Sequence, residues 1–129
     1  MKKSPDCPTW LTEDEYKLVW KDQAEVIMLE VGSIKDPGKL YELLIRKPNE
    51  ITYSLSSRCI SNIKEGANDI YKSQTVFADY CILKAQPELQ AELDDPATAT
   101  PSKIAIGKLI GELYPIPEAK LKKSLTKPV

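Results

Sequence analysis

The chain has 129 residues, with 18 Lys and Arg against 19 Asp and Glu, three cysteines and no histidine. Because histidine is the usual general base and the commonest metal ligand, its absence excludes serine–histidine and cysteine–histidine catalysis and any zinc site that needs imidazole. The length is that of one domain, which we expect to cover residues 1–129, with irregular or frayed ends at 1–10 and 118–129.

Hydrophobic patterning and cysteine usage favour a cytoplasmic protein with no membrane association. The longest apolar run is Val26 to Leu29, which is too short to span a bilayer, and no apolar stretch follows the first residues as in a secretory signal. The cysteines, at positions 7, 59 and 81, are odd in number and lack CxxC spacing. A disulfide framework or a cysteine-only zinc site is therefore not expected.

Charge is distributed unevenly along the chain. Residues 118–129 hold four lysines and one glutamate, whereas the rest of the chain has an excess of acidic residues. The net charge of −1 argues against a dedicated electrostatic nucleic-acid binder. We interpret the basic tail as a solvated end of the chain.

Most segments between the ten prolines predict helices. The first predicted helix runs from Thr12 to Val31, because Thr12 and Glu15 fit a capping box and apolar residues then recur at three- and four-residue spacing. Taken alone, residues 25–31 also fit a buried strand. A second, short helix is predicted between Pro37 and Pro48.

Three longer helices are predicted in the second part of the chain. They cover 49–71, a stretch from Ser73 as N-cap towards Pro87, and Ser102 to about Tyr114, with one or two further turns within 118–125. Residues 51–56 also alternate with period two. We therefore predict a mainly α fold, a compact bundle of five or six short helices, with an α+β alternative in which 25–31 and 51–56 are strands.

No motif indicates catalysis, a metal or a small-molecule cofactor. The five glycines form no phosphate-binding loop, and the acidic segment 88–95 matches no calcium loop, so we expect an exposed acidic bend there. No cysteine has an activating base near it in the sequence. We predict that the protein is not an enzyme. An enzyme would have to rely on carboxylates, lysine, tyrosine or a thiol, and Asp79 and Glu65 are the polar pair to inspect.

The fifth predicted helix contains two glycines four residues apart, Gly107 and Gly111. This spacing puts both on one side and lets another backbone approach closely. The neighbour is either the third predicted helix of the same chain or a second chain. For the second case, the candidate interface is Gly107, Gly111, Ile104 and Lys108.

Residues 67–84 loosely fit a helix-turn-helix, with the turn at 71–74. In that interpretation, Gln74 pairs with adenine and Lys72 and Ser73 contact phosphate. The candidate DNA-reading set is Lys72, Ser73, Gln74 and Thr75. The fit is imperfect, because Tyr71 occupies the usual glycine position and Asp79 adds negative charge.

By elimination, the sequence favours a small, non-enzymatic cytoplasmic protein that binds another protein, or a second copy of itself, through a helical surface. An adaptor, inhibitor or assembly factor fits this description. The alternative is a helix-turn-helix DNA-binding regulator that uses residues 67–84. Trp10 and Trp20 flank the start of the first predicted helix, and we expect one in the core and one over a loop.

Overall fold

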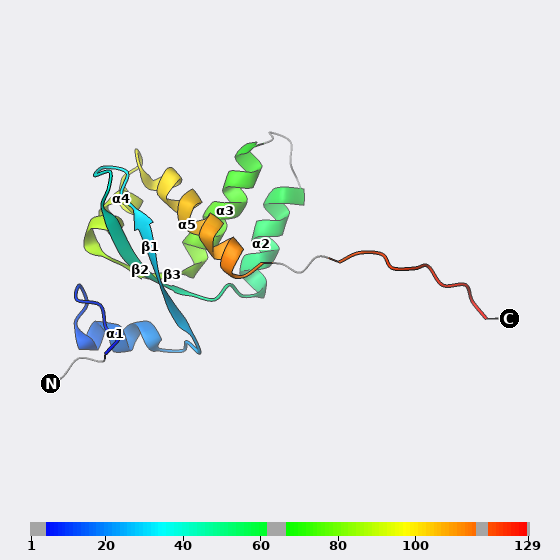
Figure 1. Cartoon of the computed structure of the whole chain (residues 1–129), viewed down its shortest axis with the longest axis horizontal. Coiled ribbons are helices and arrows are strands. Elements are labelled where there is room, and N and C mark those ends of the chain that lie inside the picture. The colour runs from blue at the N-terminus through cyan, green and yellow to red at the C-terminus, as the bar shows by residue number, and fades with distance from the viewer. Residues whose placement is uncertain (1–4, 62–66, 116–118, 129) are drawn as a thin grey trace.

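The protein is an α+β fold in which a three-stranded antiparallel sheet lies between a layer of helices and one isolated helix (Figure 1). The computed structural model describes residues 5–61, 67–115 and 119–128. Its elements are α1 (Glu13–Trp20), β1 (Val26–Gly32), β2 (Leu40–Arg46), α2 (Glu50–Ser61), α3 (Ala67–Cys81), β3 (Ile82–Ala85), α4 (Pro87–Asp94) and α5 (Ala99–Leu113).

The sheet replaces two stretches of predicted helix. β1 pairs with β2 along its whole length, from Val26 opposite Arg46 to Gly32 opposite Leu40. The helix predicted over 12–31 instead ends at Trp20, and Asp22 adopts a left-handed φ of 62° in the turn that follows. The prediction of a bundle made of helices alone is therefore wrong, and the α+β alternative is correct for residues 25–31. At 51–56 that alternative is wrong, because these residues lie in α2.

The second predicted helix, between Pro37 and Pro48, is wrong for the same reason. Residues 33–39 form the hairpin loop, in which Gly38 has a φ of 95° and Ser33 N–H donates to the carbonyl of Lys39 at 2.9 Å. Leu40, Leu43 and Leu44, which the predicted helix would bury, lie in β2, which pairs on both sides. Pairing with β1 and β3 outweighs the local helix preference of leucine and glutamate.

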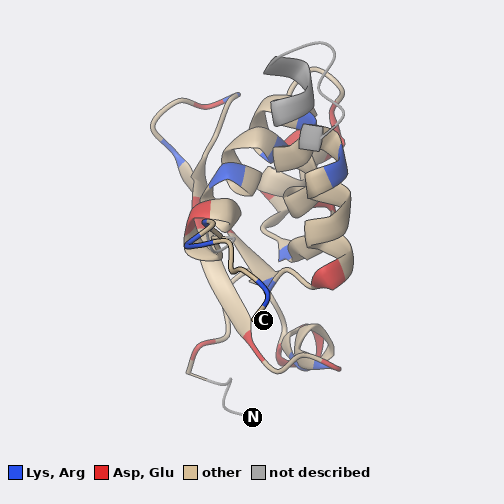
Figure 2. Ribbon diagram, turned by 90° about the vertical axis from the view of Figure 1, so that its right-hand side faces the viewer, with Lys and Arg blue, Asp and Glu red and all other residues tan. Residues whose placement is uncertain are grey.

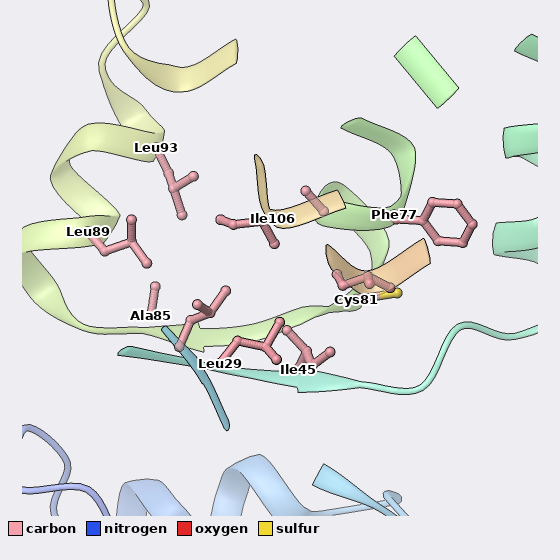
Figure 3. Close-up of a cluster of buried hydrophobic side chains, with 11 residues drawn as sticks. Leu29, Ile45, Phe77, Cys81, Ala85, Leu89, Leu93 and Ile106 are labelled. Atoms are coloured by element: carbon pink, nitrogen blue, oxygen red, sulfur yellow. The ribbon is translucent and has the colours of Figure 1, made fainter. Parts of the chain in front are cut away.

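The main core lies between one face of the sheet and the helices α3, α4 and α5 (Figure 3). Alternate strand residues point into it, whereas their neighbours point to the opposite face. The buried set is Leu29, Leu43, Ile45, Phe77, Ala78, Cys81, Ala85, Leu89, Leu93, Ile106 and Ile110.

In the described part of the chain, α1 and the segment before it lie on the opposite side of the sheet from the other helices (Figure 1). Leu44 and Leu11 are buried on this side, and Trp10 Nε1 donates to Glu42 Oε1 at 3.1 Å. α1 itself has no buried residue. The predicted capping box is confirmed, since Glu15 N–H donates to Thr12 Oγ1 and Thr12 N–H donates to Glu15 Oε1.

Candidate binding surface on the outward face of the sheet

β1 is an edge strand, and no described strand pairs with its outer side. Ser33 and Lys39 are hydrogen-bonded across the hairpin, and in an antiparallel ladder such pairs recur every second residue. The N–H and C=O groups of Val26, Met28 and Glu30 therefore point away from β2. No described residue hydrogen-bonds to them. We call these three residues the β1 edge; Met28 is 40% exposed and Glu30 is exposed.

A groove of about 610 Å³ lies next to the β1 edge, between the outward face of the sheet and the N-terminal part of the chain. One wall is formed by residues 5–9 and by Tyr16 and Trp20 of α1, whose rings make an edge-to-face contact with centroids 6.3 Å apart. We call this the outer groove. Its lining is Pro5, Asp6, Cys7, Pro8, Thr9, Tyr16, Trp20, Val26, Met28, Glu42 and Leu44.

The outer groove combines aromatic rings with negative charge. Asp6 and Glu42 line it, and no lysine or arginine is among its lining residues. Glu42 is held in place from two sides: its carboxylate accepts the indole N–H of Trp10, and its backbone N–H donates to Gln86 Oε1 at 3.0 Å. Carboxylates beside aromatic faces attract cationic side chains. The groove is therefore chemically suited to a basic, partly apolar segment.

α1 has few attachments to the rest of the protein. Two smaller hollows, of about 540 and 390 Å³, lie along its other side, and Glu15 and Lys84 line both. The Glu15 carboxylate and the Lys84 ammonium are 3.9 Å apart and about half exposed, which is a weak ion pair. α1 is therefore a loosely held wall of the outer groove.

The paired glycines of α5 have different surroundings. A Cβ placed on Gly107 would overlap the backbone carbonyl of Gln74, whereas one on Gly111 would meet nothing within 4 Å. Gly107 thus permits close packing of α5 against α3 inside the protein and is inaccessible to a second chain. Ile104 is partly buried, and Lys108 is exposed. The structure therefore does not bring the four predicted interface residues together on one accessible surface.

The predicted turn at 71–74 is wrong, because these residues lie inside the continuous helix α3. Ser73 is not an N-cap. It is buried, and its hydroxyl lies 2.6 Å from that of Ser56 on α2. Of the other predicted DNA-reading residues, Lys72 is exposed, whereas Gln74 and Thr75 are partly buried. Residues 71–74 therefore do not form the turn that the helix-turn-helix interpretation requires, and DNA binding stays a prediction.

The acidic segment 88–95 contains a buried carboxylate. Glu92 is only 3% exposed and accepts hydrogen bonds from Ser33 Oγ and Ile34 N–H, both at 2.7 Å, and from Lys35 N–H at 3.4 Å. Burial raises the pKa of Glu92, but these hydrogen bonds and the charge of Lys35 outweigh it and hold the pKa below its usual value. The exposed bend predicted here is wrong at Glu92, which fastens the β-hairpin loop to α4.

The residues considered for catalysis or metal binding do not converge. Asp79 forms an ion pair with Lys103 at 2.8 Å, and Glu65 lies outside the described residues. Burial raises the pKa of the Cys81 thiol to about 11, despite the lowering effect of Arg46. Among residues 5–61, 67–115 and 119–128, no three Cys, Asp or Glu side chains are grouped closely enough to hold a metal ion.

Sequence reasoning missed the outer groove, because it placed residues 25–31 in a helix. The signal that could have found it is the alternation of Ile27, Leu29 and Val31, which puts Met28 on the opposite face. Comparisons with protein-family models, curated proteins and solved structures find no match. Within the described part of the chain, no helix is long and apolar enough to cross a membrane.

Proposed function

We propose that this protein binds other proteins by taking up an extended segment of the partner along the β1 edge. The roles of adaptor, inhibitor or assembly factor remain open under this proposal. The single observation that carries it is the position of an unpaired edge strand beside a groove that is open to solvent. In strand addition, main-chain hydrogen bonds supply affinity, and pockets for alternate side chains supply specificity.

The backbone of β1 supports this mode of binding. Its outward N–H and C=O groups have no partner among the described residues, and β1 is seven residues long, which is longer than β3. Natural proteins usually protect such edges with proline, a bulge or a covering segment. β1 contains no proline, and the irregularity in this sheet lies between β2 and β3 instead.

The outer groove supplies the side-chain recognition. Every second residue of an added strand faces the same side of the sheet as Met28, where Tyr16, Trp20 and Glu42 also lie. These residues suit apolar and basic side chains at alternate positions. The absence of disulfides among Cys7, Cys59 and Cys81 agrees with the cytoplasmic location that we propose.

The experiment compares two substitutions at one edge position. Peptides are selected from a displayed random library on the wild-type protein, and their affinities are measured for Glu30→Pro and Glu30→Ala. Both variants lack the carboxylate, but only proline lacks the outward N–H, and proline is tolerated on an edge strand. We expect Glu30→Pro to bind at least tenfold more weakly than Glu30→Ala, with both variants folded by circular dichroism. Equal affinities would overturn the proposal.

A further inference from the structure

The C-terminal tail, residues 119–128, contains two leucines that contact almost nothing. The tail forms neither helix nor strand and runs away from the folded body (Figure 1). Leu121 is 87% exposed and Leu125 is 82% exposed, the highest values among the large hydrophobic residues described. Leucines this exposed gain nothing from the fold, so they are available for a surface outside it.

The spacing of the tail residues combines apolar and basic side chains in one short segment. Leu121 and Leu125 are four residues apart, which places them on the same side both in an extended strand and in a helix. Lys122 and Lys123 stand between them, and Lys127 follows. Figure 2 shows blue basic positions along the tail that ends at C. In an extended strand, Lys123 and Lys127 share the side of Leu121 and Leu125, so apolar and basic side chains alternate along that side.

The chemistry of the tail complements that of the outer groove and the β1 edge. The groove holds the Asp6 and Glu42 carboxylates with apolar and aromatic walls, and Glu30 adds an exposed carboxylate on the β1 edge. None of these three carboxylates forms an ion pair with a described residue. Opposite charges along the two surfaces favour their encounter and fix their alignment.

We infer that the C-terminal tail of one copy binds along the β1 edge and outer groove of a second copy. This inference rests on the proposed function, of which it names one partner. The tail leaves the body after Tyr114, which packs in the core on the helical side of the sheet, whereas the groove lies on the other side. To reach the groove of its own copy, the tail would have to pass around the sheet. To reach the groove of a second copy, it does not.

The test uses two variants of the full chain with complementary defects. In the tail variant, Leu121→Ser and Leu125→Ser remove the two apolar side chains but leave the groove intact. In the groove variant, Glu30→Pro removes an outward N–H but leaves the tail intact. Sedimentation velocity should show concentration-dependent self-association of the wild type, weakened at least tenfold in each variant. A mixture of the two should form a complex that neither forms alone, because one intact tail meets one intact groove.

The controls separate this inference from the proposed function. Leu113→Ser makes the same chemical change at an exposed leucine of α5, outside both surfaces, and should leave self-association unchanged. A wild type that is monomeric up to about 1 mM, or a mixture that forms no complex, overturns the inference; a tail bound to its own groove gives the first result, with a mixture that still forms the complex. If the tail variant still selects library peptides that require the Glu30 N–H, the proposed function stands without this partner.

Discussion

The carbonyl oxygen of Gln74 on α3 lies directly against the α-carbon of Gly107 on α5, where a Cβ has no room. α3 and α5 therefore pack backbone to backbone at this point, and the position requires glycine for space. Gly111, one turn further along, has no neighbour within 4 Å of a Cβ placed on it. Substitutions at the two glycines therefore form a matched pair, which tests whether each position needs glycine for the contact between α3 and α5.

We expect Gly107→Ala to lower the free energy of unfolding by about 3 kcal/mol, because the added methyl forces two helix backbones apart. Gly111→Ala should instead raise it by about 0.5 kcal/mol, since alanine has the higher helix propensity. Urea denaturation followed by circular dichroism measures both. Equal effects of the two substitutions would show that α3 and α5 do not pack as described.

Glu92 makes stability depend on pH in the acidic range. Its pKa in the folded protein lies below the ordinary value of 4.5, so the unfolded chain binds the proton more tightly. The stabilisation is therefore complete above pH 4.5 and is lost as pH falls through the lower, folded pKa. Denaturation at a series of pH values should show a steeper acid loss for wild type than for Glu92→Gln.

At neutral pH, Glu92→Gln should lower the free energy of unfolding by about 2 kcal/mol, because the hairpin loop donates hydrogen bonds to a charged acceptor in the wild type. Asp94→Asn, at an exposed position of the same helix, serves as the control and should change stability little. If Glu92→Gln and wild type lose stability in parallel below pH 4.5, the carboxylate does not have the role assigned to it.

The hydroxyls of Ser56 and Ser73 join α2 to α3 through a buried contact of 2.6 Å. Removing either hydroxyl deletes the 2.6 Å bond between them, and removing that of Ser56 also deletes its longer bond to the Ser73 carbonyl at 3.3 Å; removing both leaves no unsatisfied hydroxyl there. Each single substitution to alanine should therefore lower the free energy of unfolding by about 1 kcal/mol or more. The double variant should lose less than the sum of the two single effects. A double-mutant cycle measured by urea denaturation gives the coupling; additive costs would argue against the pairing.

The thiols should differ in reactivity. Only the thiolate reacts with alkylating reagents, and Cys81 is fully buried with a pKa raised to about 11. We expect iodoacetamide at pH 8 to modify the partly exposed Cys7 at least a hundredfold faster than Cys81, with mass spectrometry of proteolytic peptides as the readout. In urea the rates should become similar. Rapid labelling of native Cys81 would contradict the described core.

Local signals predicted the parts of the fold that depend on local interactions. The capping box of Thr12 and Glu15 and the apolar helix after Ser102 are both present, since each is specified by residues within a few turns. Residues 26–32 and 40–46 become strands only because they pair with each other, and short apolar runs do not carry that information. The β1–β2 hairpin and the outward face of the sheet therefore could not be predicted from local sequence patterns.

The candidate site was hidden for the same reason. Tyr16, Trp20 and Met28 line one groove only after β1 is recognised as a strand and α1 is placed across the sheet. Ser73 shows the converse error, in which a residue typical of an N-cap is used inside a helix for a contact with Ser56. In both cases the deciding interaction joins residues far apart in the sequence.

α1 should be the least stable helix of the described part of the chain. It has no buried residue, and its ion pair between Glu15 and Lys84 is long and exposed, whereas α5 buries Ile106 and Ile110. Amide exchange follows the free energy of local opening. Hydrogen-exchange mass spectrometry should therefore show α1 amides opening with roughly 1–2 kcal/mol, near the low end of the range for native proteins, and α5 amides exchanging far more slowly. Bound peptide should slow exchange in α1 and β1 together, because both form the walls of the outer groove. Protection of free α1 equal to that of α5 would mean that the helix is not a loosely held wall.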